Sequence, residues 1–393
     1  MKKQQLSSEN ALTIQSHTID WIRFPLMFLI IIDHVASTVI PQLTSFNILN
    51  IGFTGSDVYG VFRAVIDTAR KVNVPGFFLI SGYLFFYRVE GWNKKIYISK
   101  LKKRVFSLLI PYLIWNTIAA LTRPVLLIAS SIVNRTSFSG ISEYFQSILE
   151  KGILNIYWHF NTWNETTINV LGWSTPNLGP ISIPMWFLQS LICLSVITPL
   201  IYIIVRYLKI WGVAVLGLLC FTGIWFTFPG FRISAIFYFT LGAYFSINKL
   251  NMVFELRRFR YLLFPISVIT LITTIIMSYS NYSGYNYTEG IFIMVATLSA
   301  FVIVSHFVEK ETVKQHNTLT KSIFFIYASH TILFVVKAVG VLFGIVTFHS
   351  QAWFVLFLGY FIVPVVTAAL CFVGYLFLRR LLPPVARVLS GNR

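Results

Sequence analysis

Charged residues are scarce in this sequence. Only 11% of its 393 residues are charged, and 13 of them are acidic, whereas 56% are hydrophobic and 17% aromatic. A soluble domain of this length could not bury so much apolar side chain. The composition therefore excludes a soluble protein. Repeated apolar runs of about 17 to 27 residues predict instead a polytopic helical membrane protein.

Other absences narrow the class further. The three cysteines, Cys193, Cys220 and Cys371, lie inside apolar runs, which excludes a disulfide framework and indicates small packing residues. We find no phosphate-binding loop, zinc-ligand spacing, dinucleotide fingerprint or internal repeat, so no metal is expected. The chain is polar up to about His17 and then enters a full-length apolar run, which is not the pattern of a cleavable signal peptide.

The apolar runs predict an all-α fold with about ten transmembrane helices. Their expected limits are 19–40, 72–87, 105–133, 184–205, 211–228, 231–247, 261–279, 290–307, 322–348 and 352–378. The second run is short for a spanning helix, and the third and ninth are long. Breaks or tilts are expected at those places.

The distribution of Lys and Arg predicts the orientation. Of the 31 basic residues, 22 fall in the segments that share a side with the N-terminus, 6 fall on the opposite side and 3 lie within the runs. By the positive-inside rule, both termini are cytoplasmic. The net charge of +18 then marks topology and contact with anionic membrane lipids, and no nucleic acid is expected. The expected organisation is a cytoplasmic segment 1–18, a membrane domain 19–380 and a cytoplasmic tail 381–393.

The first apolar run contains two ionisable side chains, Arg23 and His34, with ten residues between them. On a helix, eleven steps of 100° bring the two residues within about 20° of one face and about 16 Å apart along the axis. Ionisable side chains at membrane depth usually mark a function. The alternatives are a neutral core histidine and an ion pair of Arg23 with Asp20. Asp33 lies about 100° around the helix from His34 and is not expected to orient it directly.

Several further motifs accompany this pair. They are Pro75-Gly-Phe-Phe-Leu-Ile-Ser-Gly-Tyr-Leu84, Lys100-Leu-Lys-Lys-Arg-Val-Phe-Ser-Leu-Leu-Ile-Pro-Tyr112, Pro184-Met-Trp-Phe-Leu188 and Ser322-Ile-Phe-Phe-Ile-Tyr-Ala-Ser-His330. Together with the Arg23–His34 spacing, and in this order, they resemble the acyltransferase 3 family of integral membrane O-acyltransferases. The resemblance extends over about residues 15–380.

The resemblance implies transfer of an acyl group, usually acetyl, from cytoplasmic acyl-CoA to a hydroxyl of a cell-surface or lipid-linked glycan. It also implies a bacterial-type inner membrane. The family often carries two arginines, Arg-x-x-Arg, before the third span, whereas here Arg104 is followed at the matching position by Ser107. Lys102 and Lys103 can supply the missing charge. Some members also carry a C-terminal esterase-like domain, which we do not find in this sequence.

The chemistry of acyl transfer assigns expected roles. An acceptor hydroxyl needs a base, and His34 is the candidate because imidazole takes protons near neutral pH. The phosphates of CoA need cations, for which Arg23, Lys102, Lys103 and Arg104 are the candidates. The basic run is alternatively a topology signal alone. The pantetheine arm is similar in length to the separation of Arg23 and His34, so the thioester could reach the imidazole from the membrane surface.

Two more residues are weaker candidates for this site. His330 is expected to hold the acceptor or the tetrahedral oxyanion, or else to be structural. Tyr83 is expected to line the acyl-CoA channel, although its neighbours Ser81 and Gly82 are typical of close helix packing. In the longest outer segment, 134–183, tryptophans mixed with Asn and His indicate a lid or interfacial belt, or alternatively contact with a sugar.

Two other classes of function remain open from the sequence. A transporter or flippase of a glycan or lipid-linked sugar would move intact substrate, but such proteins usually show internal repeats and paired acidic residues. A membrane scaffold of a polysaccharide-synthesis complex would tolerate loss of His34. Radiolabel transfer from acetyl-CoA distinguishes an acyltransferase from both.

Overall fold

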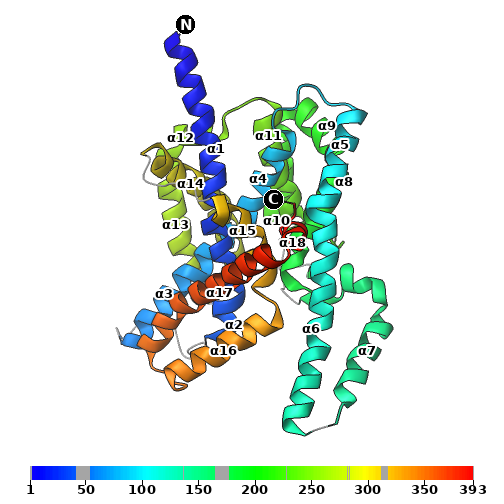
Figure 1. The fold of residues 1–393 in the computed structure, drawn as a ribbon. Coiled ribbons are helices and arrows are strands. Elements are labelled where there is room, and N and C mark those ends of the chain that lie inside the picture. The colour runs from blue at the N-terminus through cyan, green and yellow to red at the C-terminus, as the bar shows by residue number, and fades with distance from the viewer. Residues whose placement is uncertain are drawn as a thin grey trace.

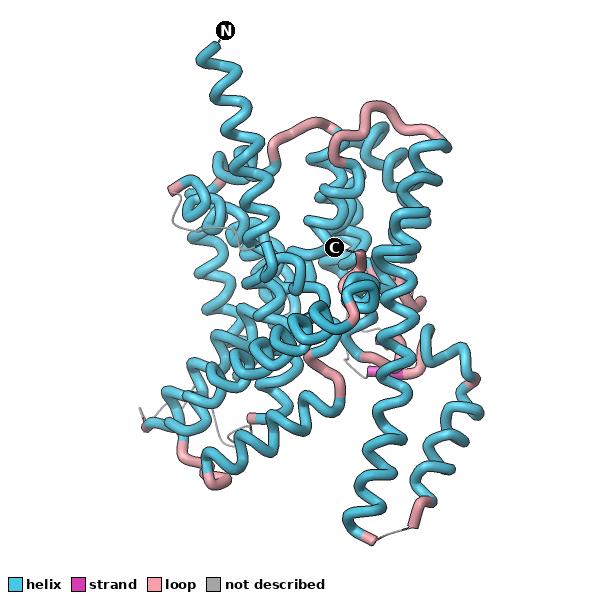
Figure 2. The backbone as a smooth tube through the Cα atoms, in the orientation of Figure 1, coloured by secondary structure: helices cyan, strands magenta, loops and turns pink. Residues whose placement is uncertain are grey.

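The computed structural model describes residues 2–40, 54–135, 137–163, 177–226, 228–280, 282, 284–310 and 317–392. Helices make up 84% of the structure, which confirms the predicted all-α class (Figure 2). One short antiparallel pair, β1 (Asn161–Trp163) and β2 (Asn177–Gly179), aligns Thr162 with Leu178.

The helices form one bundle from which the α6–α7 hairpin extends away (Figure 1). In chain order the helical elements are α1 (Lys2–Ile31), the π-helical turn η1 (Ile32–Ala36), α2 (Ser37–Val39), α3 (Gly55–Ala69), η3 (Arg70–Val72), α4 (Asn73–Phe86), α5 (Lys94–Arg104), the π-helical turn η4 (Val105–Leu109), α6 (Ile110–Asn134), α7 (Ser139–Lys151), η5 (Ile153–Tyr157), η6 (Ile183–Met185), α8 (Trp186–Val196), α9 (Thr198–Ile203), the π-helical turn η7 (Ile204–Leu208), α10 (Lys209–Thr222), α11 (Ile233–Ile247), α12 (Met252–Arg258), α13 (Arg260–Tyr279), α14 (Tyr285–Glu309), α15 (Asn317–Ser329), α16 (Leu333–Thr347), α17 (Trp353–Leu381) and α18 (Pro383–Leu389).

The described residues contain six helices long and apolar enough to cross a membrane, and a bent pair would make seven. The six are Ala11–Val39, Lys94–Asn134, Thr198–Thr222, Arg260–Ser278, Tyr285–Glu309 and Trp353–Leu381. The chain is thus a multi-pass membrane protein, but the predicted count of ten spans is not confirmed. α4 and α11 account for part of the difference because their 14 and 15 residues reach only about 21–23 Å, short of a hydrocarbon core of about 30 Å.

One of these six helices is sharply turned. Lys209 has φ 50°, and a Cβ added to Gly212 would lie 2.6 Å from Cγ2 of Ile204. Residues eight positions apart in a straight helix lie about 12 Å apart along its axis. The chain therefore turns back at Lys209, where the sequence predicts a connection between two spans, and η7 packs against α10.

The two unusually long apolar runs behave differently. The ninth is broken, because α15 and α16 meet at an angle of 89° across residues 330–332. The third is continuous from Lys94 to Asn134 but contains the π-helical turn η4. The prediction of a break is therefore confirmed for the ninth run, and the third departs from regular α-helix at Val105–Leu109.

The sequence interpretation missed helix α3, which packs beside α17 and α13. Its start carries a recognisable signal. The Thr54 side chain accepts a hydrogen bond from the Asp57 amide, and the Asp57 carboxylate accepts one from the Thr54 amide. This reciprocal capping box satisfies amides that the first helical turn leaves unpaired. The sequence predicts a boundary between the N-terminal segment and the membrane domain at residues 18 and 19. Helix α1 runs through this position without a break, from Lys2 to Ile31.

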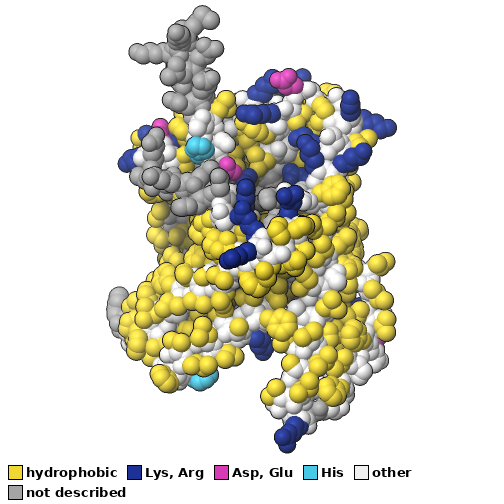
Figure 3. Space-filling model, in the orientation of Figure 1, with side chains coloured by type: hydrophobic (Ala, Val, Ile, Leu, Met, Phe, Trp, Pro, Cys, Tyr) yellow, Lys and Arg dark blue, Asp and Glu magenta, His cyan; other side chains and the backbone are white. Residues whose placement is uncertain are grey.

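Basic side chains gather at one end of the molecule. On the face seen in Figure 3, Lys and Arg cluster around the end that carries the N-terminus, and a broad apolar surface covers the rest. Large apolar side chains such as Val133, Trp211 and Phe377 are well exposed there and on other helices. Such a surface is stable against lipid and not against water, in agreement with a membrane protein.

A close crossing of α4 and α11 lies at the centre of the bundle. A Cβ added to Gly82 would overlap the carbonyl oxygen of Phe239, and one added to Gly242 would overlap that of Leu79. Only glycine lets the two backbones approach so closely. The expectation that Gly82 serves helix packing is confirmed.

We predict that Gly82→Ala or Gly242→Ala destabilises the purified protein by at least about 1–3 kcal/mol, because the new methyl group meets backbone that cannot move aside. Thermal unfolding in detergent measures the effect. Gly340→Ala is the matched control, since nothing lies within 4 Å of its added Cβ. Equal stability of the Gly82 and Gly340 variants would contradict the crossing.

Candidate functional site

His34 lies in the π-helical turn η1, where the first long helix departs from α geometry. Two hydroxyl side chains bond back to this turn: Ser37 Oγ donates to the carbonyl of Asp33, and Thr38 Oγ1 donates to that of His34 at 2.7 Å. Such back-bonding often bends a helix. Single π-helical turns are frequent at functional sites, and here the turn sets the direction of the His34 side chain.

His330 occupies the break between α15 and α16. Its backbone N–H still donates to the Ile326 carbonyl at 3.1 Å, but α15 ends at Ser329. The last carbonyls of a helix lack partners within that helix. The Tyr327 carbonyl is instead hydrogen-bonded to Nδ1 of His330, at 2.6 Å. The helix end thus determines the orientation of a fully buried imidazole.

The same contact assigns the tautomer of the neutral ring. A carbonyl oxygen only accepts hydrogen bonds, so the proton of the imidazole belongs on Nδ1 and the lone pair on Nε2. Nε2 of His330 is buried and has no hydrogen-bond partner among the described residues. Buried polar atoms are nearly always paired, and one that is not is a candidate for contact with a substrate.

The fold brings His34 and His330 together from opposite ends of the chain. Their ring centroids lie 5.5 Å apart, with the ring planes inclined by 41°. The sequence singles out both histidines but predicts no contact between them. Asp33 directly precedes His34 in the chain, and its carboxylate pairs with Arg70. This pairing agrees with the expectation that Asp33 does not orient His34 directly.

A narrow cavity of about 90 Å³ lies between α1, α4, α8 and α15, the end of α5, and η4. Arg23 and Arg104 both line it, so two cations from separate elements face one small space. Its other lining is apolar or aromatic except for Ser81 and the hydroxyl of Tyr327. Tyr327 also connects the cavity to the histidines, because its ring centroid lies 6.1 Å from that of His330.

The two arginines differ in their surroundings. Arg23 Nη1 lies 2.9 Å from Asp20 Oδ1, so the ion pair considered from the sequence is present. That pair and the cavity contact are compatible, because a guanidinium carries five N–H donors. Arg104 stacks over the Phe85 ring at 5.4 Å and has no acidic partner within the described part of the chain. Arg104 therefore carries the less compensated charge.

Lys102 and Lys103 lie outside this cavity. Both are exposed and line an open hollow of about 730 Å³ on the surface of α5, together with Lys94, Lys95, Ile98 and Ser99. The sequence motif missed Lys94 and Lys95, which precede it by one to two helical turns. The basic hollow and the cavity share helix α5, because Lys103 lines the hollow and the next residue, Arg104, lines the cavity.

Tyr83 lies apart from the other candidates. Its hydroxyl accepts a hydrogen bond from the Gln15 side chain, its ring packs against Tyr87 at 5.5 Å, and it is not among the residues that line the cavity. Ser81 on the same helix does line it. Tyr327 is the residue that sequence reasoning missed. Its position three residues before His330 was a usable signal, because residues three apart share a helix face.

The comparisons with known proteins bear on the whole chain. A family model described as an acyltransferase domain, the acyltransferase 3 model, matches residues 16–375. The chain belongs to the acyltransferase 3 family. The match includes the second half of α1, the broken helix and most of α17, so the site described above lies within it.

No curated protein and no solved structure gave a match. Membership in the acyltransferase 3 family nevertheless makes this chain a membrane acyltransferase that uses an acyl donor and an acceptor. Among the described residues, no group of three His, Cys, Asp or Glu side chains is placed to hold a metal ion.

Proposed function

We propose that this acyltransferase moves an acetyl group from cytoplasmic acetyl-CoA to a hydroxyl of a cell-surface or lipid-linked glycan in a bacterial-type inner membrane. The observation that carries the proposal is the convergence of two histidines beside a cavity lined by two arginines. Histidine supplies a base near neutral pH, and arginine binds phosphate bidentately. The glycan class of the acceptor rests on the family resemblance.

The sizes of the two hollows support a divided binding mode for the donor. A cavity of about 90 Å³ holds only the volume of roughly three water molecules. It is too small for a nucleotide and suits the narrow pantetheine arm that leads to the thioester. The hollow of about 730 Å³ beside Lys102 and Lys103 is large enough and carries the opposite charge to phosphate. Arg23 and Arg104 line the small cavity, and they would bind the phosphates that join the nucleotide to the pantetheine arm.

The reaction assigned to the histidines balances without a further reactant. The acceptor oxygen attacks the thioester carbonyl while His34 takes the hydroxyl proton. The tetrahedral intermediate then expels the CoA sulfur, and the proton passes from His34 to that sulfur. The products are an O-acyl ester and free CoA, and His34 returns to its neutral state.

His330 has a supporting role in this mechanism. Nε2 of its neutral tautomer carries a lone pair, and its ring lies beside that of His34. When His34 becomes positively charged, that lone pair can accept a hydrogen bond from the new imidazolium or from the acceptor hydroxyl. A hydrogen-bond acceptor that is already in place costs no rearrangement at the moment of reaction.

The proposed orientation places both termini and the basic hollow in the cytoplasm. A cysteine at Glu90 should therefore react only with a membrane-permeant maleimide in intact cells, and one at Ser142 should also react with an impermeant maleimide. Both positions are exposed in the structure, and the three native cysteines are buried or half-buried. Impermeant labelling at Glu90 and not at Ser142 would reverse the orientation.

We predict that Arg104→Met lowers acetyl-CoA affinity about tenfold to a hundredfold, because a charge-assisted phosphate contact is worth about 1.5–3 kcal/mol. Adding Arg23→Met should lower it further. Isothermal titration of the purified protein measures both. Arg123→Met is the control, since Arg123 lies over Tyr144 and outside the cavity lining. Unchanged affinity in the double variant would overturn the donor site.

His34→Gln should lower the rate of acyl transfer about a hundredfold to ten-thousandfold, because glutamine hydrogen-bonds but cannot take the proton. Acetyl-CoA affinity and thermal stability should match those of His306→Gln, a control at an exposed histidine on α14. Transfer of radiolabelled acetyl groups to envelope glycans is the measurement.

A structural role for His34 predicts the opposite result. His34→Gln would then retain most of its turnover, and His34→Ala would lose activity in step with its thermal stability. Near-wild-type turnover by the glutamine variant would remove His34 from the mechanism.

A further inference from the structure

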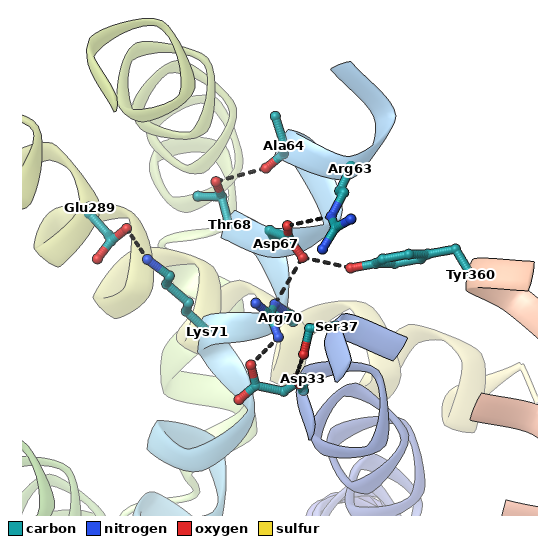
Figure 4. A network of polar contacts seen from close by, with 10 residues as sticks. All are labelled: Asp33, Ser37, Arg63, Ala64, Asp67, Thr68, Arg70, Lys71, Glu289 and Tyr360. Carbon is teal, nitrogen blue, oxygen red and sulfur yellow. Dashed lines mark hydrogen bonds and ion pairs between the residues drawn. The ribbon is translucent and has the colours of Figure 1, made fainter. Parts of the chain in front are cut away.

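A network of four charged side chains lies beside the π-helical turn that carries His34 (Figure 4). Arg70 Nη1 pairs with Asp33 Oδ1, and Arg70 Nε lies 3.2 Å from Asp67 Oδ1. Asp67 Oδ2 also lies 3.3 Å from Arg63 Nε, and the hydroxyl of Tyr360 donates to Asp67 Oδ1 at 2.6 Å. Two carboxylates and two guanidiniums make the network neutral overall.

The network joins three separate parts of the chain. Arg63 and Asp67 belong to α3, Arg70 follows it in η3, Asp33 belongs to η1 and Tyr360 to α17. Arg63 and Arg70 are largely buried, with 8% and 15% of their side-chain surfaces exposed. Apolar contacts of Ile32, Ala36 and Tyr360 reinforce the same junction. The Arg70 guanidinium therefore joins α3 to η1. Its Nε pairs with Asp67 on α3, and its Nη1 pairs with Asp33, the residue next to His34.

Regular α-helix and a π-helical turn differ by one residue in register. A change of one residue rotates everything beyond it by about 100°, so conversion of η1 to α-helix would turn His34 away from His330. The Arg70–Asp33 pair is attached at the centre of this turn and opposes that rotation. The guanidinium of this pair is largely buried, whereas 41% of the Asp33 side chain is exposed. Loss of Asp33 would leave the buried Arg70 charge with Asp67 as its acidic partner.

We propose that Arg70 and Asp33 are positioning residues that hold η1 in its π-helical register and so keep the His34 imidazole beside His330. The inference rests on the proposed role of His34 as base. Arg70 and Asp33 themselves touch neither substrate, and their effect on the reaction passes through His34. The neighbouring cation Lys71 pairs with Glu289 on α14 and has no link to η1.

The test compares Arg70→Met, Asp33→Asn and their double variant with Lys71→Met, which removes an adjacent ion pair. We expect kcat for acetyl transfer to fall about tenfold to a hundredfold in the first three, since small misplacements of a catalytic group cost this much. KM for acetyl-CoA should stay within about twofold. The double variant should be no slower than the slower single variant, because the two residues act as a unit. Arg70→Lys should restore part of the lost kcat by keeping the charge opposite Asp33.

A second measurement does not depend on activity. Diethyl pyrocarbonate modifies accessible imidazoles, and mass spectrometry of the peptide that contains His34 gives its rate. The rate should rise severalfold in Arg70→Met and Asp33→Asn and stay unchanged in Lys71→Met. If wild-type protein labels in this way but transfers no acetyl group, the proposed function fails while the positioning inference stands.

Three outcomes would overturn the positioning inference. One is a His34 labelling rate in Arg70→Met equal to that in Lys71→Met. Another is unchanged kcat in both Arg70→Met and Asp33→Asn while the wild type is active. The third is additive loss in the double variant that follows the fall in thermal stability, which would indicate a purely structural ion pair.

Discussion

The site depends on a helix that ends inside the apolar body of the protein. Within a bilayer, unpaired backbone carbonyls have no water to bond to, so a broken helix must satisfy them internally. The structure does so with His330, whose Nδ1 bonds to the Tyr327 carbonyl. That single contact closes the end of α15, buries the imidazole and leaves Nε2 available. The break therefore fixes the orientation of His330 beside His34 as a consequence of backbone hydrogen bonding.

The rest of the bundle holds two further departures from regular helix against this break. η1 places His34 beside His330, and η4 follows directly after Arg104. The glycine crossing of α4 and α11 fixes the wall that carries Ser81. η1 packs against α17, and η4 packs against α6 and α8. Rigid helices thus support a candidate site whose two histidines lie at helix irregularities.

The sequence predicts the helical class, because hydrophobic periodicity acts locally. Charge within an apolar run also singles out Arg23 and His34 as candidates. It predicts the break in the ninth run from length, and the packing role of Gly82 from residue size. It does not predict the contact of His34 with His330, since that contact depends on an 89° bend and on helix packing between distant segments. The sequence also places Tyr83 at the channel, whereas the cavity is lined by the face of α4 that carries Ile80, Ser81 and Leu84. Tyr83 lies one residue before Leu84, about 100° around the helix from it. α3 was missed because its mean hydropathy is lower than that of a spanning run, although Thr54 and Asp57 mark its start.

The most direct test of this account is a cryo-electron microscopy structure of the protein with a non-hydrolysable acetyl-CoA analogue. The account predicts that the phosphates contact Arg23 and Arg104, that the pantetheine arm lies in the cavity they line, and that the acyl end reaches the His34–His330 pair, with the nucleotide over the lysines of α5. An analogue bound elsewhere, or with its acyl end remote from both histidines, would contradict it.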